Sequence, residues 1–373
     1  DRERDAGTST CSSSGLEAEL TLVIVTSPVP SHPETALIEA VLSSVETHQS
    51  SLRGCRRIIV CDAPAAERAS ERSSYKVGRV SEQEAANYVE YIHRCQAKCA
   101  TGERLFERTE VVELPQRLGF GHALREGLRR VCTPYVLVLQ HDHIWIRSVD
   151  LGGIVATMRN HEELKHVVLP SQTTVGYREK ILRRYGVDLS EHSRRYPETP
   201  TQTFLPTLLW YDKPHISSPA HYESIVFHPG SPCVVGTFPE DTIGGQLLRA
   251  VLDHGLSEHA RFGTFCLEDA PRATYHLSGR KVQAAGAGQD EGAGDEDATT
   301  TSRADPCAIP SECGTAADES IVVIAPGLAA PKRAIPTHGA KKFKGLCFKC
   351  GEKGHSVRAC PLGTARPTTF LSL

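Results

Sequence analysis

Short apolar runs alternate with amphipathic segments of helical spacing over the N-terminal part of the chain. The runs rich in Val, Ile and Leu are typical of buried strands, and they cover 20–25, 57–62, 111–114 and 135–139. Between them, the predicted helices cover 36–48, 81–99 and 121–131. Strands that alternate with helices favour an α/β fold with a mainly parallel sheet and helices on both faces. Later strand candidates are 167–169, 224–227 and 272–277.

Composition divides the chain into four parts. Residues 1–19 are rich in Ser, Thr and charge without periodicity, and we expect them to be disordered. The α/β pattern fills 20–281, which we expect to fold as one domain. Residues 282–331 are expected to be an acidic, low-complexity, disordered linker, because they cannot bury enough apolar surface to offset the entropy of ordering. The tail, 332–373, contains nine Lys or Arg against the single acid Glu352.

The whole-chain charge narrows the classes of function. Lys and Arg total 42 against 45 Asp and Glu, a formal net charge of −3, so the chain is not basic throughout. Contact with nucleic acid must therefore be local, in the basic tail. No run approaches the roughly 20 apolar residues that a membrane helix requires.

Cysteine usage indicates a reducing compartment. Three of the 13 cysteines crowd into the tail, and the other ten show no pattern of a disulfide framework. We expect buried free thiols and a cytoplasmic or nuclear location. The sequence starts at Asp1 and not at Met, so we interpret it as a fragment or processed form, and a signal segment upstream stays open.

The strongest motif lies in the tail. Cys347, Cys350, His355 and Cys360 have the spacing C-x2-C-x4-H-x4-C. Three thiolates and one imidazole suit tetrahedral zinc, and four protein ligands make the site structural. A segment this short has no core of its own, so zinc would supply its folding free energy. With Phe348 after the first ligand, the segment resembles the retroviral-type CCHC zinc knuckle.

That resemblance implies binding of single-stranded RNA or DNA, and the residues permit it. Phe348 offers a ring on which a base can stack. Lys349, Lys353 and Arg358 can contact phosphates. Some knuckles bind proteins instead, so a protein partner stays open.

In the domain, acidic residues follow apolar strands. Asp62 and Asp142 stand at the ends of predicted strands, and ligands of parallel sheets bind at the carboxyl ends of strands. The segment around Gly119 and Gly121 has Leu124 where the third glycine of a dinucleotide fingerprint would stand, which argues against a dehydrogenase. No G-x-x-x-x-G-K-[ST] motif occurs, which argues against a P-loop enzyme.

Three stretches of the domain, 26–33, 119–124 and 138–143, are together similar to family-2-like glycosyltransferases of the GT-A fold. The resemblance covers about 20–281. It implies that Thr26, Ser27 and Asp62 hold the nucleotide of a sugar donor. It also implies an Asp-x-Asp motif at the end of the fourth strand, which here reads Gln140-His141-Asp142 and so lacks its first acid.

The missing acid leaves two ways to stabilise the donor diphosphate. Asp142 with His143 and His276 could hold Mn²⁺ or Mg²⁺. Alternatively, a metal is dispensable and Arg280 with Lys281 neutralises the leaving diphosphate. A plainer interpretation is that the histidines beside Asp142 merely end a strand.

The neighbouring acids Glu240 and Asp241 resemble the acidic motif that the family has before a helix. In inverting members the aspartate is the general base for the acceptor hydroxyl, and Asp241 takes that position. Acids are also common at helix N-termini, where the macrodipole favours them, so a structural role stays open.

Two functions follow from these motifs. The first is an inverting glycosyltransferase that uses a nucleotide-sugar donor, joined to a zinc knuckle that binds single-stranded nucleic acid. It expects Asp62, Asp142 and Asp241 to line one cleft, with Asp142 near His276. The alternative is a catalytically degenerate GT-A-like domain, with the knuckle as the only active part. A retroelement Gag-like protein fits less well, because such proteins are helical.

Overall fold

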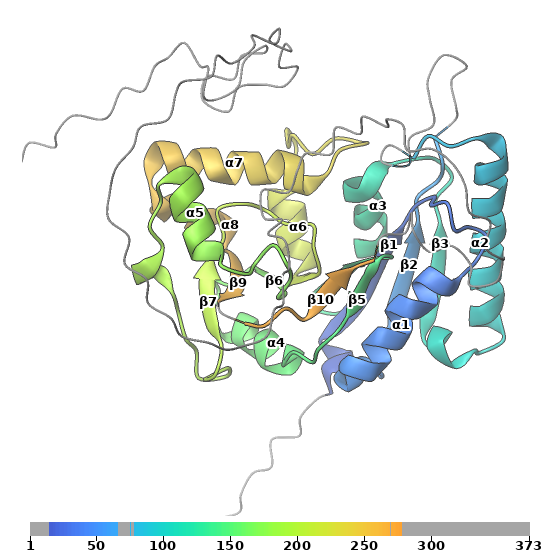
Figure 1. Cartoon of the computed structure of the whole chain (residues 1–373), viewed down its shortest axis with the longest axis horizontal. Coiled ribbons are helices and arrows are strands. Elements are labelled where there is room, and N and C mark those ends of the chain that lie inside the picture. Colours follow the sequence, from blue (N-terminus) through green and yellow to red (C-terminus); the bar gives the residue numbers. More distant parts are fainter. Residues whose placement is uncertain (1–14, 66–74, 76–77, 269, 278–373) are drawn as a thin grey trace, which may run out of the picture. The chain divides into compact units, whose positions relative to one another are not determined.

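The computed structural model describes residues 15–65, 75, 78–268 and 270–277 (Figure 1). The predicted N-terminal disordered segment up to residue 14, the linker and the tail with its knuckle lie outside the described residues. Among the residues described, no helix combines the length and the apolar character that crossing a membrane takes.

The domain is built on an eight-stranded sheet in the order β3-β2-β1-β4-β8-β6-β9-β7. Its strands are β1 Leu20–Thr26, β2 Arg57–Cys61, β3 Thr109–Glu113, β4 Tyr135–Gln140, β6 His166–Val168, β7 Thr203–Pro206, β8 His215–Ser217 and β9 Thr264–Glu268. The first four strands pair in parallel, and so do β6 and β9. Strand β8 runs antiparallel to β4 and β6, and β7 antiparallel to β9. The predicted mainly parallel α/β fold is confirmed.

Helices cover both faces of the sheet (Figure 1). They are α1 Ala36–His48, α2 Glu82–Ala100, α3 Gly119–Leu128, α4 Leu151–Asn160, α5 Tyr177–Tyr185, α6 Pro219–Ile225, α7 Pro239–His254 and α8 His259–Phe262. Successive side chains of a strand point to opposite faces, so β1 contributes to two separate cores. Leu22 and Ile24 pack in one core with α1, α2 and α4, and Val23 and Val25 in the other with α3, α5, α6, α7 and α8.

Local sequence signals explain where several elements begin. Ser81 caps α2 in a capping box, its side chain accepting from the N–H of Glu84 while the Glu84 carboxylate accepts from the N–H of Ser81. The predicted strand at 224–227 is wrong, because this segment ends α6. Ser218 caps that helix and Pro219 occupies its first turn, so the apolar run continues the helix in place of forming a strand.

A separate two-stranded sheet lies beyond the end of β4. Strand β5 (His143–Trp145) pairs antiparallel with β10 (Thr274–His276), which places His276 opposite His143. The N–H of Leu277 donates to the carbonyl of Asp142 over 2.7 Å. The last described strand is thereby held beside the carboxyl end of β4 (Figure 1).

Candidate functional site

A cleft of about 470 Å³ opens at the carboxyl ends of β1, β2 and β4. Its lining residues are Val25, Thr26, Ser27, Pro28, Val29, Pro30, Asp62, Tyr75, Arg117, Phe120, Gln140, His141, Asp142, Phe238 and His276. This is the place where ligands of open α/β sheets bind. The cleft therefore brings together Thr26, Ser27, Asp62, Asp142 and His276, which the sequence singled out.

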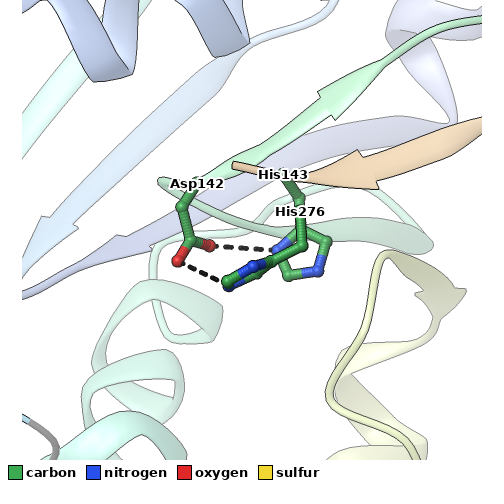
Figure 2. A group of neighbouring side chains, drawn as sticks. All are labelled: Asp142, His143 and His276. Atoms are coloured by element: carbon green, nitrogen blue, oxygen red, sulfur yellow. Dashed lines mark hydrogen bonds and ion pairs between the residues drawn. The ribbon is translucent and has the colours of Figure 1, made fainter. Parts of the chain in front are cut away.

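Asp142 and His276 of the cleft lining converge with His143 on one point. Figure 2 shows the three side chains turned toward one another. Nδ1 of His143 lies 3.1 Å from one carboxylate oxygen of Asp142, and Nε2 of His276 lies 3.0 Å from the other. The two imidazole rings meet edge to face with their centroids 4.9 Å apart. Ligand atoms of all three residues lie within 4.8 Å of one another, which is close enough for one cation.

The charges of this cluster suit a cation as well. Burial by itself would raise the pKa of Asp142, but the hydrogen bonds from His143 and His276 outweigh it and hold that pKa far below its usual range. Burial lowers the pKa of His143, although the bond to Asp142 acts in the opposite direction. At neutral pH the cluster thus offers an ionised carboxylate and a neutral imidazole, the protonation states that bind metals.

Asp62 lies directly after β2 and is 2% exposed. One of its oxygens accepts the N–H of Leu118 at 2.7 Å, and the other accepts the N–H of Gly119 at 3.0 Å. Arg117 adds an ion pair at 3.2 Å. Burial raises the pKa of Asp62, and these donors counteract it. Asp62 thus fixes the N-terminus of α3 and holds the Arg117 guanidinium at the cleft.

The two residues after Val25 line the cleft at the end of β1. Thr26 is buried, and its carbonyl accepts the N–H of Asp62 over 2.9 Å. Its hydroxyl has no hydrogen-bond partner among the described residues. Ser27 is half-buried. Both residues therefore line the same cleft as Asp62.

Gln140 stands where the resemblance expects the first acid. Its side-chain nitrogen donates to the carbonyl of Asp212 over 3.0 Å. Asp212 is 2% exposed and makes two hydrogen bonds with Glu240. Its Oδ2 accepts the N–H of Glu240 at 3.0 Å, and its own N–H donates to Oε2 of Glu240 at 3.3 Å. Gln140 thus connects the end of β4 to the N-terminus of α7.

The predicted acidic pair begins α7. Glu240 is half-buried and Asp241 is exposed, and neither is among the described residues that line the cleft. The first residue before the helix, Phe238, does line it and stacks on Phe120 with ring centroids 5.7 Å apart. The acidic pair therefore lies beside the cleft and not in its wall.

Two contacts of the site were not predicted from the sequence. Arg117 has no motif around it, and only its ion pair with Asp62 shows its place in the cleft. Burial and the neighbouring Glu240 raise the pKa of Asp212 well above its usual value, and that proximity comes from a long-range contact. Other predicted residues lie outside the described part of the chain: Arg280, Lys281, Cys347, Phe348, Lys349, Cys350, Lys353, His355, Arg358 and Cys360.

Comparison with known proteins identifies the tail motif. Residues 345–362 match the family model of the zinc knuckle, which confirms the CCHC knuckle that the cysteine and histidine spacing predicted. A zinc knuckle implies bound Zn²⁺. No curated protein matches the sequence.

Solved structures similar to the domain include enzymes of sugar transfer. S. aureus TarS matches at 13% identity and a TM-score of 0.36, over 69% of this chain and 36% of TarS. A Pyrobaculum calidifontis mannosyltransferase, solved with GDP-Man and Mn²⁺, matches at 16% identity and a TM-score of 0.39, over 68% of this chain and 55% of that one. Glucosyl-3-phosphoglycerate synthase of Mycobacterium tuberculosis, solved with Mn²⁺, UDP and glucosyl-3-phosphoglycerate, matches at 15% identity and a TM-score of 0.35, over 70% and 72%.

The chain thus spans about a third of TarS and about half of the mannosyltransferase. Because the identities and TM-scores are this low, the activity, donor and metal of these proteins are not assigned to this chain.

Proposed function

We propose that the domain transfers a sugar from a nucleotide-sugar donor to an acceptor hydroxyl, and that the knuckle recruits single-stranded nucleic acid. The observation that carries the transfer proposal is the convergence of Asp142 and His276 in the same cleft as Asp62. These residues come from three separate parts of the chain. Their meeting at the carboxyl ends of parallel strands supports a nucleotide site.

The aromatic part of the cleft lining suits the donor's base. Phe120 and Phe238 stack on each other and both line the cleft, together with Tyr75. Aromatic faces bind nucleic-acid bases by stacking. Arg117, 19% exposed in its side chain, lines the same cleft and is held there by Asp62.

The side of the cleft at β4 suits the donor's diphosphate. Asp142, His143 and His276 would hold the cation, and two imidazoles favour Mn²⁺ over Mg²⁺, which prefers oxygen ligands. A divalent cation bound there would neutralise charge on the diphosphate as it leaves. Arg280 and Lys281 follow β10 closely in the sequence and are the alternative source of that charge.

For the acceptor, we propose Asp241 as the general base. It would take the proton of the acceptor hydroxyl while the hydroxyl oxygen bonds to the anomeric carbon and the bond to the diphosphate breaks. Its support is its position: it is exposed in the first turn of α7, three residues after Phe238 of the cleft wall. Attack from the side opposite the leaving group makes this an inverting transfer.

The proposal for the tail rests on its matched knuckle and its charge. Phe348 would stack on a base, while Lys349, Lys353 and Arg358 would contact phosphates. Binding of single strands would bring the domain to RNA or DNA, or to an acceptor associated with it. A protein partner is the other outcome that the knuckle admits.

A nucleotide-sugar panel tests the transfer proposal. The full chain is incubated with UDP-, GDP-, CDP- and dTDP-sugars, with and without Mn²⁺, and release of the nucleoside diphosphate is followed. We expect one donor class to be hydrolysed slowly with Mn²⁺, and Asp142→Ala to lose this activity while Asp253→Asn, on the exposed part of α7, keeps it. If no donor is bound or hydrolysed, the proposal fails.

One observation favours a second function, nucleotide binding without transfer. Gln140 replaces the first acid of the motif, and its amide is engaged by the Asp212 carbonyl and so brings no negative charge to the cation cluster. In that case a nucleotide-sugar of the panel would bind in the presence of Mn²⁺. No nucleoside diphosphate would be released from it, whether or not an acceptor is added.

A further inference from the structure

The small sheet of β5 and β10 has one face that the candidate cation cluster does not use (Figure 1). His143 and His276 stand directly opposite each other, so their side chains share a face of this sheet (Figure 2). Tyr275 and its partner Ile144 point to the other face, because successive side chains of a strand alternate. We call this other face, made of Ile144, Ile146 and Tyr275, the Tyr275 face.

The Tyr275 face is apolar and open to solvent. Tyr275 is 45% exposed and Ile146 is 40% exposed, while Ile144 is half-buried. Among the exposed large apolar side chains of the described residues, Tyr275 is the aromatic one, and the others are Val, Leu and Ile. Single exposed apolar side chains are common on any surface, but a ring and an aliphatic side chain on one face of a two-stranded sheet form a patch that can bind a partner.

Two arginines border the Tyr275 face. The Arg272 guanidinium lies 5.3 Å from the centroid of the Tyr275 ring, a cation–π contact that holds it beside the ring. The N–H of Ile146 donates to the carbonyl of Ala273 over 2.8 Å, so the antiparallel register continues beyond β5. It places the exposed Arg147 across from Arg272. Among the residues that the structure describes, neither arginine forms an ion pair with a carboxylate. Two neighbouring cations without an acid favour a negatively charged partner.

An exposed ring flanked by free cations fits single-stranded nucleic acid. Bases stack on aromatic side chains, and arginine binds the phosphates between them. Arg272 donates one N–H to the side-chain oxygen of Gln172 at 3.0 Å. That oxygen is neutral, so the charge of Arg272 stays available for a phosphate. A neutral sugar could also stack on the ring, but it would give the two cations no counter-charge.

The place where the tail follows the domain supports the same partner. Strand β10 is the last described strand, and about 70 residues separate it from the first zinc ligand, Cys347. A flexible chain of that length has an r.m.s. span of about 45 Å. A single strand bound by the knuckle would therefore meet the Tyr275 face in an intramolecular step, at an effective concentration on the order of millimolar.

We infer that the Tyr275 face is a second binding surface for single-stranded nucleic acid, on which Tyr275 stacks on a base and Arg147 and Arg272 contact the adjoining phosphates. The inference rests on the part of the proposed function that assigns single strands to the knuckle. It extends that function, because it gives the domain a contact of its own with the strand, on the side of β10 opposite the cation cluster.

Photo-crosslinking locates the contact. The full chain is irradiated with a single strand of about 40 nucleotides that carries 5-iodouridine, a length of several binding sites, and is then digested with trypsin. We expect RNA on the peptide 273–280, attached at Tyr275. Tyr275→Phe keeps the ring and should keep the crosslink. Tyr275→Ile suits a strand and stays apolar, but it should lose the crosslink. A single strand that crosslinks to the tail and never to this peptide would overturn the inference and leave the role of the knuckle in place.

Affinities measured on the same variants give the size of the effect. Tyr275→Ile should weaken binding by about tenfold, the value of one stacked base. The double variant Arg147→Gln, Arg272→Gln should lower the slope of log K against log salt by about 1.4, or about 0.7 for each lost phosphate contact. Arg184→Gln is the matched control and should keep the wild-type affinity and slope, because Arg184 lies 5.3 Å from the ring of Tyr185 in the same kind of contact, on α5. Wild-type affinity and slope in all these variants would overturn the inference.

A knuckle variant separates this inference from the proposed function. Cys350→Ser removes a zinc ligand and should weaken binding, and the binding that remains at low salt should still depend on Tyr275. If Tyr275→Ile weakens binding and Cys350→Ser does not, the domain binds the strand and the proposed role of the knuckle fails. If the wild-type chain binds no single strand at low salt, that part of the proposed function and this inference both fail.

Discussion

His276 places its Nε2 3.0 Å from a carboxylate oxygen of Asp142, although one residue ends the last described strand and the other follows β4. The pairing of β5 with β10 sets this contact, because it puts His276 opposite His143. The N–H of Leu277, bonded to the Asp142 carbonyl, holds the same strands together. Sheet pairing, and not a long loop, therefore determines the geometry of the candidate cation site.

Asp62 should contribute strongly to stability, whatever it binds. It accepts from the N–H groups of Leu118 and Gly119 and pairs with Arg117. We expect Asp62→Ala to lower the free energy of unfolding by about 2–4 kcal/mol, because buried donors lose their acceptor. Asp62→Asn keeps one acceptor and should lose less. Urea unfolding measures both, and an Asp62→Ala chain as stable as wild type would contradict this role.

Asp212 should make stability depend on pH. Burial and Glu240 raise its pKa, so the folded chain keeps a proton that the unfolded chain releases above about pH 4. Stability should then fall as pH rises from there toward the raised pKa, by about 1.4 kcal/mol for each pH unit in that range. Asp212→Asn should remove this decline and melt higher than wild type near pH 8. Parallel melting curves against pH for the two chains would contradict the prediction.

Asp241 should act on the acceptor and not on the donor. We expect Asp241→Asn to leave nucleotide binding unchanged and to reduce transfer by at least 100-fold, the effect of losing a general base. Asp253→Asn changes another exposed carboxylate of α7 and is the control. Transfer rates and nucleotide Kd values, measured on the same preparations, check the prediction. If Asp241→Asn and Asp253→Asn transfer sugar at equal rates, the general base is another residue.

The tail should bind one zinc ion and use it to bind single strands. Metal analysis of the full chain should show zinc that Cys350→Ser loses and Cys132→Ser, an exposed free cysteine of the domain, keeps. Affinity for single-stranded RNA should fall steeply with salt, and Phe348→Ala should weaken it by about tenfold or more. If the chain contains zinc but does not bind single-stranded RNA at low salt, the knuckle is a protein-binding module.

The first half of the domain could be predicted because its elements carry local signals. Helix α1 matches its predicted bounds, and α2 begins at the predicted capping box. The second half could not be predicted as well. The candidates at 167–169 and 272–277 match β6 and β10, but β5 and β8 were not predicted. These two strands have three residues each, too few for a period, and they form because neighbouring strands supply their hydrogen bonds. The apolar run at 224–227 shows the converse, a strand-like composition that a helix N-cap overrides.

The candidate site was accessible to sequence reasoning only in part. Asp62 and Asp142 follow apolar strands, a signal that is local, and His276 came from the resemblance. The ion pair of Arg117 with Asp62 and the hydrogen bond of Gln140 to Asp212 join residues far apart in the chain. No pattern of neighbouring residues encodes those contacts.

Nucleoside diphosphate binding, measured with and without Mn²⁺, tests whether the cleft and the Asp142–His143–His276 cluster form one nucleotide site. We expect the full chain to bind UDP or GDP in the cleft only when Mn²⁺ is present, because Asp142, His143 and His276 would hold the cation at the diphosphate. Asp142→Ala should weaken this binding by at least 10–100-fold, comparable to the loss of a group that orients metal ligands. Binding that is equally tight without Mn²⁺ and in Asp142→Ala would contradict the cation site, and no binding at all would contradict the nucleotide site.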